Sequence, residues 1–428
     1  MTQRYNQFIA GGGLGGLLTT ALLSQKGQSV FLAEKLPFYG GRFTAFKYHG
    51  FEVPTGAVHM IPHSYRGPLG HLLVNELNLP IEIRDIENFT AWYWPKRKPI
   101  RHRNFWGIFK ALPKVNQRIF VLRKLLLGVR NSEQHLESFQ EYLESHTNDP
   151  QIFKFFNAIT GFALSLDISE LSTASMYRFL RRLYQRGRPG VPIGGCKAVV
   201  NALINHSKQN NAILQKNIEL VKLESDGSMI KTAICRHVKT NEEFEIHAEQ
   251  FILNLGHPQV NKVLKTSKMS FKLPTVPSAR GGGFIYRCKT PILGSSAVSQ
   301  FPEHHYVKGA VEPSAVSPGL APKGEHLFLT HQVFHSDNIT QDIKRSRDEL
   351  LETLPQLDET DELCVHTFNK DWPVNYAAQG SDISNFCEDI SNLFFVGDSY
   401  KGKEGWFMTE GIAHGVKLVV EELLSNSG

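Results

Sequence analysis

Three glycines and one glutamate near the start of the chain have the types and spacing needed to hold a phosphate ester. A short apolar stretch from Tyr5 runs into Gly11-x-Gly13-x-x-Gly16, a helical pattern follows, and a second apolar run ends at Glu34. In such a unit the first glycine permits a tight turn, the second lets backbone approach a pyrophosphate, and the third lets the helix pack closely. The helix N-terminus offers N–H groups to the phosphates. These residues predict a dinucleotide site.

Glu34 and the residues after it narrow the choice of dinucleotide. A carboxylate about 20 residues beyond the glycines is placed to accept a hydrogen bond from a ribose 2′-hydroxyl, and it repels the 2′-phosphate of NADP. Gly40 and Gly41 then precede Arg42. Paired glycines let the backbone pass close to a bulky ligand, and an arginine adds a positive fork near its phosphates. The alternative is a pair of glycine-rich turns without a ligand.

Several motifs resemble FAD-dependent flavoproteins of the amine-oxidase and phytoene-desaturase (phytoene dehydrogenase-like) type. At the N-terminal end these are GGGLGG, AEK, GGR and VPTGAVHMIP, and near the C-terminal end a strand leads into Gly397-Asp398. The segment 405–412, which contains Met408, Thr409 and Glu410, is similar to the helix start beside the flavin ring. The resemblance implies non-covalent FAD held by both ends of the chain.

The predicted cofactor-binding residues combine the turn motifs with the positions that the resemblance supplies. They are Gly11, Gly13, Leu14, Gly16, Glu34, Lys35, Gly41, Arg42, Gly56, Ala57, Val58, His59, Leu220, Gly397, Asp398, Met408, Thr409 and Glu410. By the resemblance, Asp398 accepts hydrogen bonds from sugar hydroxyls and Leu220 lies against the adenine. Backbone N–H groups around Thr409 and Glu410 would then face the flavin N1 and O2, where a helix dipole stabilises negative charge.

His59 is the candidate catalytic residue. It follows Gly56, Ala57 and Val58 in the loop that resembles the flavin-facing turn, and histidine exchanges a proton near neutral pH. The alternative is that His59 only caps a loop. The sequence has no Gly-x-Ser-x-Gly or His-Glu-x-x-His motif and no His and Cys cluster, so neither a hydrolase nor a metal site is predicted.

The elements that must position these residues form two large domains, which 428 residues can accommodate. The predicted fold class is α/β, with a Rossmann-like FAD-binding domain built from the discontinuous segments 1–65, 190–258 and 386–428. An α+β substrate domain, a mixed sheet plus a helical cap, takes 66–189 and 259–385. Between 63 and 189 the pattern is mainly helical, and strand signals dominate from 258.

Composition suggests an ordinary globular protein, with 41% apolar and 21% charged residues. The five cysteines form no CxxC pair, which indicates a reduced intracellular setting. The chain lacks a secretory leader pattern and any uninterrupted apolar run of about 20 residues. We therefore expect a cytoplasmic protein, with peripheral membrane association as an open alternative.

The basic segment, residues 96–130, carries eleven cations and no acid, interleaved with aromatic and aliphatic residues. Such an amphipathic segment fits an anionic membrane surface. The alternative is a helix pair whose apolar side is core and whose cations are solvated. No recognition motif for nucleic acid accompanies it, so no nucleic-acid partner is predicted. The oligomeric state is not specified by the sequence.

The resemblance implies an FAD-dependent oxidoreductase that transfers hydride between flavin N5 and a small apolar substrate, of isoprenoid or carotenoid type. Pro54 stands before Thr55-Gly56 where carotene desaturases carry an acid, so the chain looks closer to compact phytoene dehydrogenase-like proteins. The first alternative is an amine oxidase, in which Trp406 would flank the ring. The second is a non-catalytic lipid-binding or prenyl-binding protein of the same fold.

Overall fold

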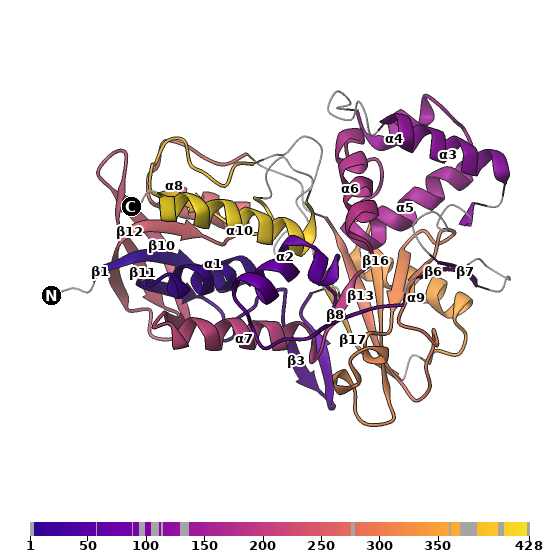
Figure 1. The fold of residues 1–428 in the computed structure, drawn as a ribbon, viewed down its shortest axis with the longest axis horizontal. Helices are drawn as coiled ribbons and strands as arrows, with labels where there is room; N and C mark the ends of the chain where they lie inside the picture. The colour runs from indigo at the N-terminus through magenta and orange to yellow at the C-terminus, as the bar shows by residue number, and fades with distance from the viewer. Residues whose placement is uncertain are drawn as a thin grey trace.

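The computed structural model describes residues 4–56, 58–87, 89–93, 99–103, 111–112, 114–128, 137–274, 279–358, 361–368, 383–400 and 406–425. The structure has two halves, each built on one large sheet. Both ends of the chain lie on the half whose sheet contains the first strand, Arg4–Ala10 (Figure 1).

The first sheet has a parallel centre built from distant parts of the chain. β1 (Arg4–Ala10) pairs in parallel with β2 (Val30–Glu34) and β12 (Glu243–Leu253). β9 (Ile213–Lys216) extends it beside β2, and the short β18 (Leu393–Phe395) pairs with the end of β12. β11 (Ile230–His237) and β10 (Ile218–Ser225) add an antiparallel hairpin. Because both faces are covered, the C-terminal ends of β1 and β12 and most of β2 are apolar runs, Phe8–Ala10, Phe251–Leu253 and Val30–Ala33.

Three helices pack on one face of this sheet. They are α1 (Leu14–Gln25), α7 (Gly195–Gln209) and α10 (Met408–Ser425), and Figure 1 shows α10 running beside α1. α8 (His257–Thr266) packs on β10, and its apolar residues join the core on the other face. Leu69 of α2 (Pro68–His71) and the following Leu72 and Leu73 are buried in the core with α1. These leucines fall within 66–189, which the sequence analysis assigned to the substrate domain and its cap. The domain boundaries remain a prediction.

Two small antiparallel pairs lie outside the two large sheets. β3 (Ala45–Tyr48) pairs with β4 (Phe51–Pro54), and β5 (Ile83–Asp85) pairs with β8 (Gly190–Pro192). The second pair joins two segments that flank the helical cap, so the cap leaves and rejoins the body at one place.

The second sheet is mixed, as predicted. Its strands, in spatial order, are β17 (Glu362–Phe368), β13 (Gly281–Cys288), β16 (His326–Val333), β15 (Val307–Val311), β14 (Val298–Gln300), β6 (Phe89–Trp92) and β7 (Ile100–Arg103). Only the β14–β6 pairing among these is parallel. α9 (Ile339–Thr353) packs against β15 and buries Leu350 in the core of Phe284 and Phe328.

The described part of 63–189 is mainly helical, as predicted, but β6 and β7 are two short strands within it. Their residues form an edge of the second sheet because β6 pairs with β14, more than 200 residues later in the sequence. Periodicity within a short segment does not report such long-range pairing.

The helical cap stands over one side of the second sheet (Figure 1). It contains α3 (Val115–Gly128), α4 (Phe139–Glu144), α5 (Pro150–Leu164) and α6 (Thr173–Arg186). Side chains cap the last three: Ser138 and Glu141 form a capping box, Asp149 accepts from Gln151 N–H, and Ser172 accepts from Ser175 N–H. No helix in the described part of the chain is both long and apolar enough to cross a membrane.

Candidate cofactor and active site

A single cavity of about 950 Å³ extends from the glycine turn after β1 to the face of β16. Its size is near the upper end for small-molecule sites. Of the predicted cofactor residues it is lined by Gly11, Gly13, Leu14, Glu34, Lys35, Gly41, Arg42, Gly56, Val58, Leu220, Gly397, Asp398, Met408 and Thr409. Gly16, His59 and Glu410 are not among its lining residues, and Ala57 lies outside the described residues.

The glycine turn has the geometry of a phosphate cradle. Gly11 has φ +100°, which disfavours any residue with a Cβ, and a Cβ on Gly16 would overlap the carbonyl oxygen of Gly11. Gly13 is the N-cap of α1 and supplies no side-chain hydrogen bond, and the first turn holds no acid. The first N–H groups of α1 therefore remain available to an anion.

Glu34 lies at the end of β2 beside this turn. Its carboxylate accepts hydrogen bonds from Gly12 N–H (2.5 Å) and Leu36 N–H (2.7 Å), and it is 6% exposed. Burial raises the pKa of Glu34, and these backbone hydrogen bonds oppose that rise. Each carboxylate oxygen has more than one lone pair, so Glu34 can still accept from a sugar hydroxyl.

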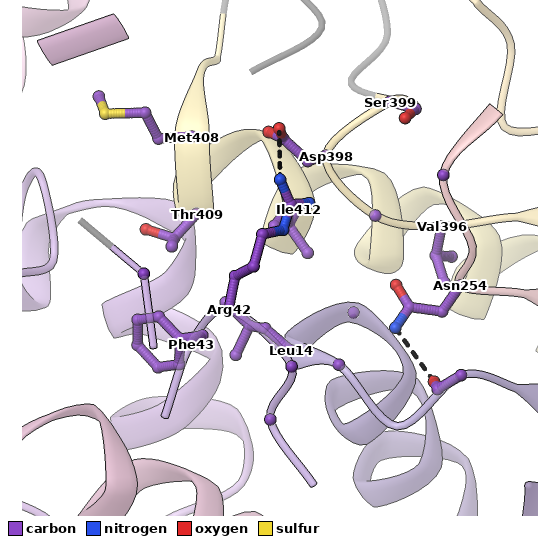
Figure 2. A pocket seen from close by; sticks show the side chains of 18 of the residues that line it. Leu14, Arg42, Phe43, Asn254, Val396, Asp398, Ser399, Met408, Thr409 and Ile412 are labelled. Carbon is purple, nitrogen blue, oxygen red and sulfur yellow. Dashed lines mark hydrogen bonds and ion pairs between the residues drawn. The ribbon is translucent and has the colours of Figure 1, made fainter. Parts of the chain in front are cut away.

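Arg42 and Asp398 bring the two ends of the chain together. The guanidinium Nη1 lies 4.0 Å from the Asp398 carboxylate, and Figure 2 shows this ion pair, with Leu14 beside the stem of Arg42. Gly397, with φ +120°, turns the chain at the end of the β18 strand segment. Arg42 and Asp398 are 356 positions apart in the sequence (398 minus 42), and the fold brings them together.

The start of α10 faces the same cavity. Met408, Thr409 and Ile412 line it, and the labelled side chains of Met408 and Thr409 lie beside Asp398 in Figure 2. The buried Thr409 hydroxyl has no hydrogen-bond partner among the described residues. A polar atom in this state calls for a ligand or water, and the helix N-terminus adds a positive dipole end at the same place.

Asn254, at the end of β12, is a site residue that the sequence analysis missed. Its amide donates to the carbonyl of Gly11 (3.0 Å), a bond drawn in Figure 2. A Cβ on Gly13, Gly15 or Gly397 would meet its side chain within 3.0 Å. Asn254 therefore fixes the glycine turn against the C-terminal segment. One sequence feature could have identified Asn254: it is a polar residue that directly follows the apolar run Phe251 to Leu253.

The far end of the nucleotide half of the cavity is lined by Ile218 and by two of the predicted cofactor-binding residues, Lys35 and Leu220. Leu220 is 8% exposed, and Lys35 pairs with Glu219 at 2.8 Å. This apolar slot with a charged rim suits an adenine ring, which has a flat apolar face and polar edges.

His59 lies behind the cavity wall. It is fully buried, its Nε2 lies 2.7 Å from the carbonyl oxygen of Glu52, and its Nδ1 accepts from Cys196 N–H (3.3 Å). Burial lowers the pKa of His59 to about 4, so the ring is neutral at physiological pH. With both nitrogens engaged, His59 matches the loop-capping alternative, and this geometry gives no support to a catalytic role.

Glu410 also points away from the cavity. Its carboxylate accepts from His63 N–H (3.1 Å) and Leu69 N–H (2.8 Å), and it is 1% exposed. Burial raises its pKa to about 7, and the two backbone donors oppose that rise. The Glu410 side chain thus ties the start of α10 to the segment 63–69, while its backbone remains at the helix N-terminus.

The remaining half of the cavity, between the cap and the second sheet, is mostly apolar. Its walls include Met60, Ile159, Phe162, Phe179, Leu183 and Val298, with Thr90, Ser165, Gln300 and His331 as polar members. We call this part the substrate chamber. Within the described residues no group of His, Cys, Asp and Glu is arranged to hold a metal ion.

A dinucleotide-binding sheet joined to a mixed-sheet domain by one long cavity defines a two-domain flavoprotein fold. The chain belongs to the family of flavin-containing amine oxidoreductases, which matches residues 14–417. The resemblance, the α/β fold class and the FAD cofactor expected from the sequence are thereby confirmed, and the protein is an FAD oxidoreductase. Non-covalent attachment of FAD and the individual site residues stay predictions.

Two similar proteins cover the chain almost completely, and a third covers about three quarters of it. An uncharacterized protein of Methanocaldococcus jannaschii is 32% identical over 97% of this chain and 99% of its own length. The crystal structure of an oxidoreductase from Methanosarcina mazei superposes with a TM-score of 0.87 at 28% identity, covering 98% of this chain and all of that one. A 4,4'-diapolycopen-4-al dehydrogenase of Metabacillus indicus is 22% identical, over 74% of this chain and 72% of its length.

The residues present fit FAD. The glycine cradle and the N-terminus of α1 would hold the pyrophosphate, Glu34 the adenosine ribose, and Asp398 the ribityl hydroxyls. The unpartnered Thr409 hydroxyl and the start of α10 would meet the flavin ring. When bound, the flavin accepts or donates a hydride at N5. The protein would supply the orientation of the flavin and a mostly apolar chamber beside it.

Proposed function

We propose that the protein transfers hydride between FAD and an apolar substrate of isoprenoid or carotenoid type. The observation that carries this proposal is the substrate chamber, whose walls are aliphatic and aromatic side chains from α5, α6 and the second sheet. Apolar walls favour an apolar ligand because burial of its surface is the main source of binding free energy. The similarity to a dehydrogenase named for a carotenoid aldehyde points to the same substrate class.

The chain's own residues have three tasks in this reaction. The chamber walls orient the reacting carbon and exclude water. The N-terminus of α10 stabilises negative charge through its free N–H groups. Proton exchange by His59 is not part of the proposal, because both of its ring nitrogens are already hydrogen-bonded outside the cavity.

Trp406 weighs against the amine-oxidase alternative. That reaction calls for aromatic side chains on either side of the substrate amine, and Trp406 was the one candidate. It is 6% exposed, it does not line the cavity, and Arg182 stacks on its ring at 4.1 Å. His63 lies against its edge. Trp406 therefore packs between the cap and α10. The complete cradle around Gly13 likewise favours an enzyme over a lipid carrier without cofactor.

We also propose that the cap meets an anionic membrane, from which an apolar substrate is drawn. Much of the basic segment lies outside the described residues, but α3 lies within it. Val115 and Ile119, one helical turn apart, are 64% and 59% exposed, beside exposed Lys114 and Arg123. Apolar residues flanked by cations are the composition of interfacial helices.

The test is anaerobic mixing of the FAD-loaded protein with an unsaturated C20 isoprenoid in vesicles, and in parallel with an aliphatic diamine. We expect the isoprenoid to bleach the oxidised flavin absorbance, or to reoxidise flavin that has been reduced beforehand, and the diamine to do neither. Bleaching by the diamine with no response to the isoprenoid would contradict the proposed substrate class.

A further inference from the structure

The substrate chamber contains a histidine that the reaction described so far does not use. His331 of β16 lines the cavity and is 2% exposed. Its Nε2 lies 2.7 Å from the Oγ of Ser165, the residue that ends α5 in a left-handed conformation (φ 60°). Its Nδ1 is buried and has no hydrogen-bond partner among the described residues. A buried nitrogen left unpaired is unfavourable and calls for an explanation.

The ring of His331 is held in one orientation. Phe368 stacks on it with centroids 5.6 Å apart, and Phe162 meets it edge-on at 6.0 Å. Its strand neighbour Gly309 has no side chain, and the ring of Phe162 fills the space that a Cβ there would take. Because packing and the Ser165 hydrogen bond fix the imidazole, Nδ1 is presented in a fixed direction before any ligand arrives.

Among the described residues, no charged side chain forms a hydrogen bond or ion pair with His331. Glu87 and Arg188 are two charged residues that line the cavity. Glu87 is exposed and its carboxylate accepts from Ser296 N–H (2.9 Å), and Arg188 donates to Asp85 (3.1 Å). Burial, with a smaller effect of His366, lowers the pKa of His331 to about 3, so the ring is neutral. A charged ligand group at this point would lack a counter-charge, which is costly in an apolar site.

We propose that His331 recognises an uncharged oxygen, a hydroxyl or a carbonyl, on an otherwise apolar substrate by a hydrogen bond at Nδ1. The Ser165 hydroxyl can rotate to donate to Nε2 or to accept from it, so Nδ1 can serve as donor or acceptor. Gln300, on the same wall, fixes its own amide on the carbonyls of Lys308 and Ala158 in the orientation that satisfies its hydrogen bonds. His331 is therefore a specificity residue. This inference rests on the proposed function, since it concerns the substrate of the same chamber.

The experiment compares two rigid probes of one shape, 1-adamantanol and 1-methyladamantane, on the FAD-loaded full chain. Dissociation constants are read from the flavin difference spectrum. We expect His331→Phe to raise the ratio of the alcohol constant to the hydrocarbon constant about 5- to 10-fold, the loss of one buried hydrogen bond. His331→Gln, which keeps a hydrogen-bonding side chain, should recover part of that loss.

The matched control is His366→Phe. His366 of β17 is half-buried, with both ring nitrogens buried over Gly283, and it does not line the cavity. Its substitution should leave the ratio unchanged. An unchanged ratio in His331→Phe, as expected if Nδ1 only meets water, overturns the proposal, and so does an equal change in His366→Phe.

The same samples separate this inference from the proposed function. If farnesol and farnesene fail to bind while the adamantanol ratio still depends on His331, the isoprenoid class is wrong and the role of His331 stands. If both isoprenoids bind but the ratio does not change in His331→Phe, the isoprenoid class stands and the role of His331 is wrong. If neither adamantane compound binds, the chamber does not accept apolar ligands and both proposals are overturned.

Discussion

Asn254 is the residue on which the two ends of the chain converge. It donates to Gly11, and a Cβ on Gly13 or Gly397 would clash with it. We predict that Asn254→Ala weakens FAD binding by about tenfold, because the turn loses the bond that fixes it, worth roughly 1–2 kcal/mol. Flavin release during equilibrium dialysis measures this.

Asn261 provides the control for that substitution. Its side chain also hydrogen-bonds to backbone, through two bonds to Leu273 (3.0 and 2.8 Å), but it does not line the cavity. Asn261→Ala should lower the free energy of unfolding while leaving FAD affinity unchanged. Equal effects of the two substitutions on FAD affinity would show that Asn254 acts only through general stability.

Gly13→Glu should abolish FAD retention. The new carboxylate would enter the pyrophosphate site, where its negative charge repels phosphate, and its Cβ would press on the Asn254 amide. The measurement is the flavin content of the purified variant. A variant that keeps a full complement of FAD would refute the assignment of this turn.

Single residues were predictable where backbone geometry demands one amino acid. Gly11 and Gly16 could be assigned from spacing because a left-handed turn and a close helix contact exclude other residues. Asn254, Ser165 and His331 could not, since each acts through partners that only the fold brings close. The role of His59 could not be assigned either, because Glu52 and Cys196, which set the direction of its side chain, are brought to it by the fold.

Among the elements, α10 couples the cofactor site to the segment 63–69 through Glu410. The pKa of Glu410 is raised from 4.5 to about 7, so between these values the folded protein holds a proton that the unfolded chain releases. The contribution of Glu410 to the free energy of unfolding therefore falls as pH rises through this window, by on the order of 3 kcal/mol. We predict that Glu410→Gln, which still accepts from Leu69, flattens that fall in urea unfolding between pH 5 and 7.5.

Glu421 on the same helix is the matched control, since its side chain is 60% exposed. Glu421→Gln should leave the pH dependence as in the parent protein. If Glu410→Gln follows the parent curve as well, then Glu410 is ionised in the folded state over the whole range, and the buried carboxyl described here is wrong.

Helices and strands with strong local signals were predictable from the sequence, and those made by long-range pairing were not. α5 carries an N-cap aspartate, a proline at its first position and regular apolar spacing. β13 and β16 each contain a buried aliphatic and aromatic stretch, Phe284–Tyr286 and Leu327–Leu329. β6 and β7 have no such signal, because their edge position depends on β14.

For the whole molecule, the exposed face of α3 predicts how the protein meets lipid. Val115→Asp with Ile119→Asp should weaken binding to anionic vesicles by roughly tenfold or more, since two apolar side chains no longer enter the interface. Co-sedimentation with vesicles that contain phosphatidylglycerol measures this. Met229→Asp with Val238→Asp, on exposed apolar residues of the other half (38% and 39%), should have no effect. If the parent protein and both double variants bind the vesicles equally, this face of α3 does not enter lipid and its cations are only solvated surface.

The central claim is that the two remote ends of the chain, joined at Arg42 and Asp398, enclose one flavin dinucleotide. The most direct measurement is denaturation of the purified protein followed by mass identification and quantification of every small molecule that is released. We predict one FAD per chain, freed without a covalent adduct. Release of no flavin, or of a nicotinamide dinucleotide in its place, would contradict the account.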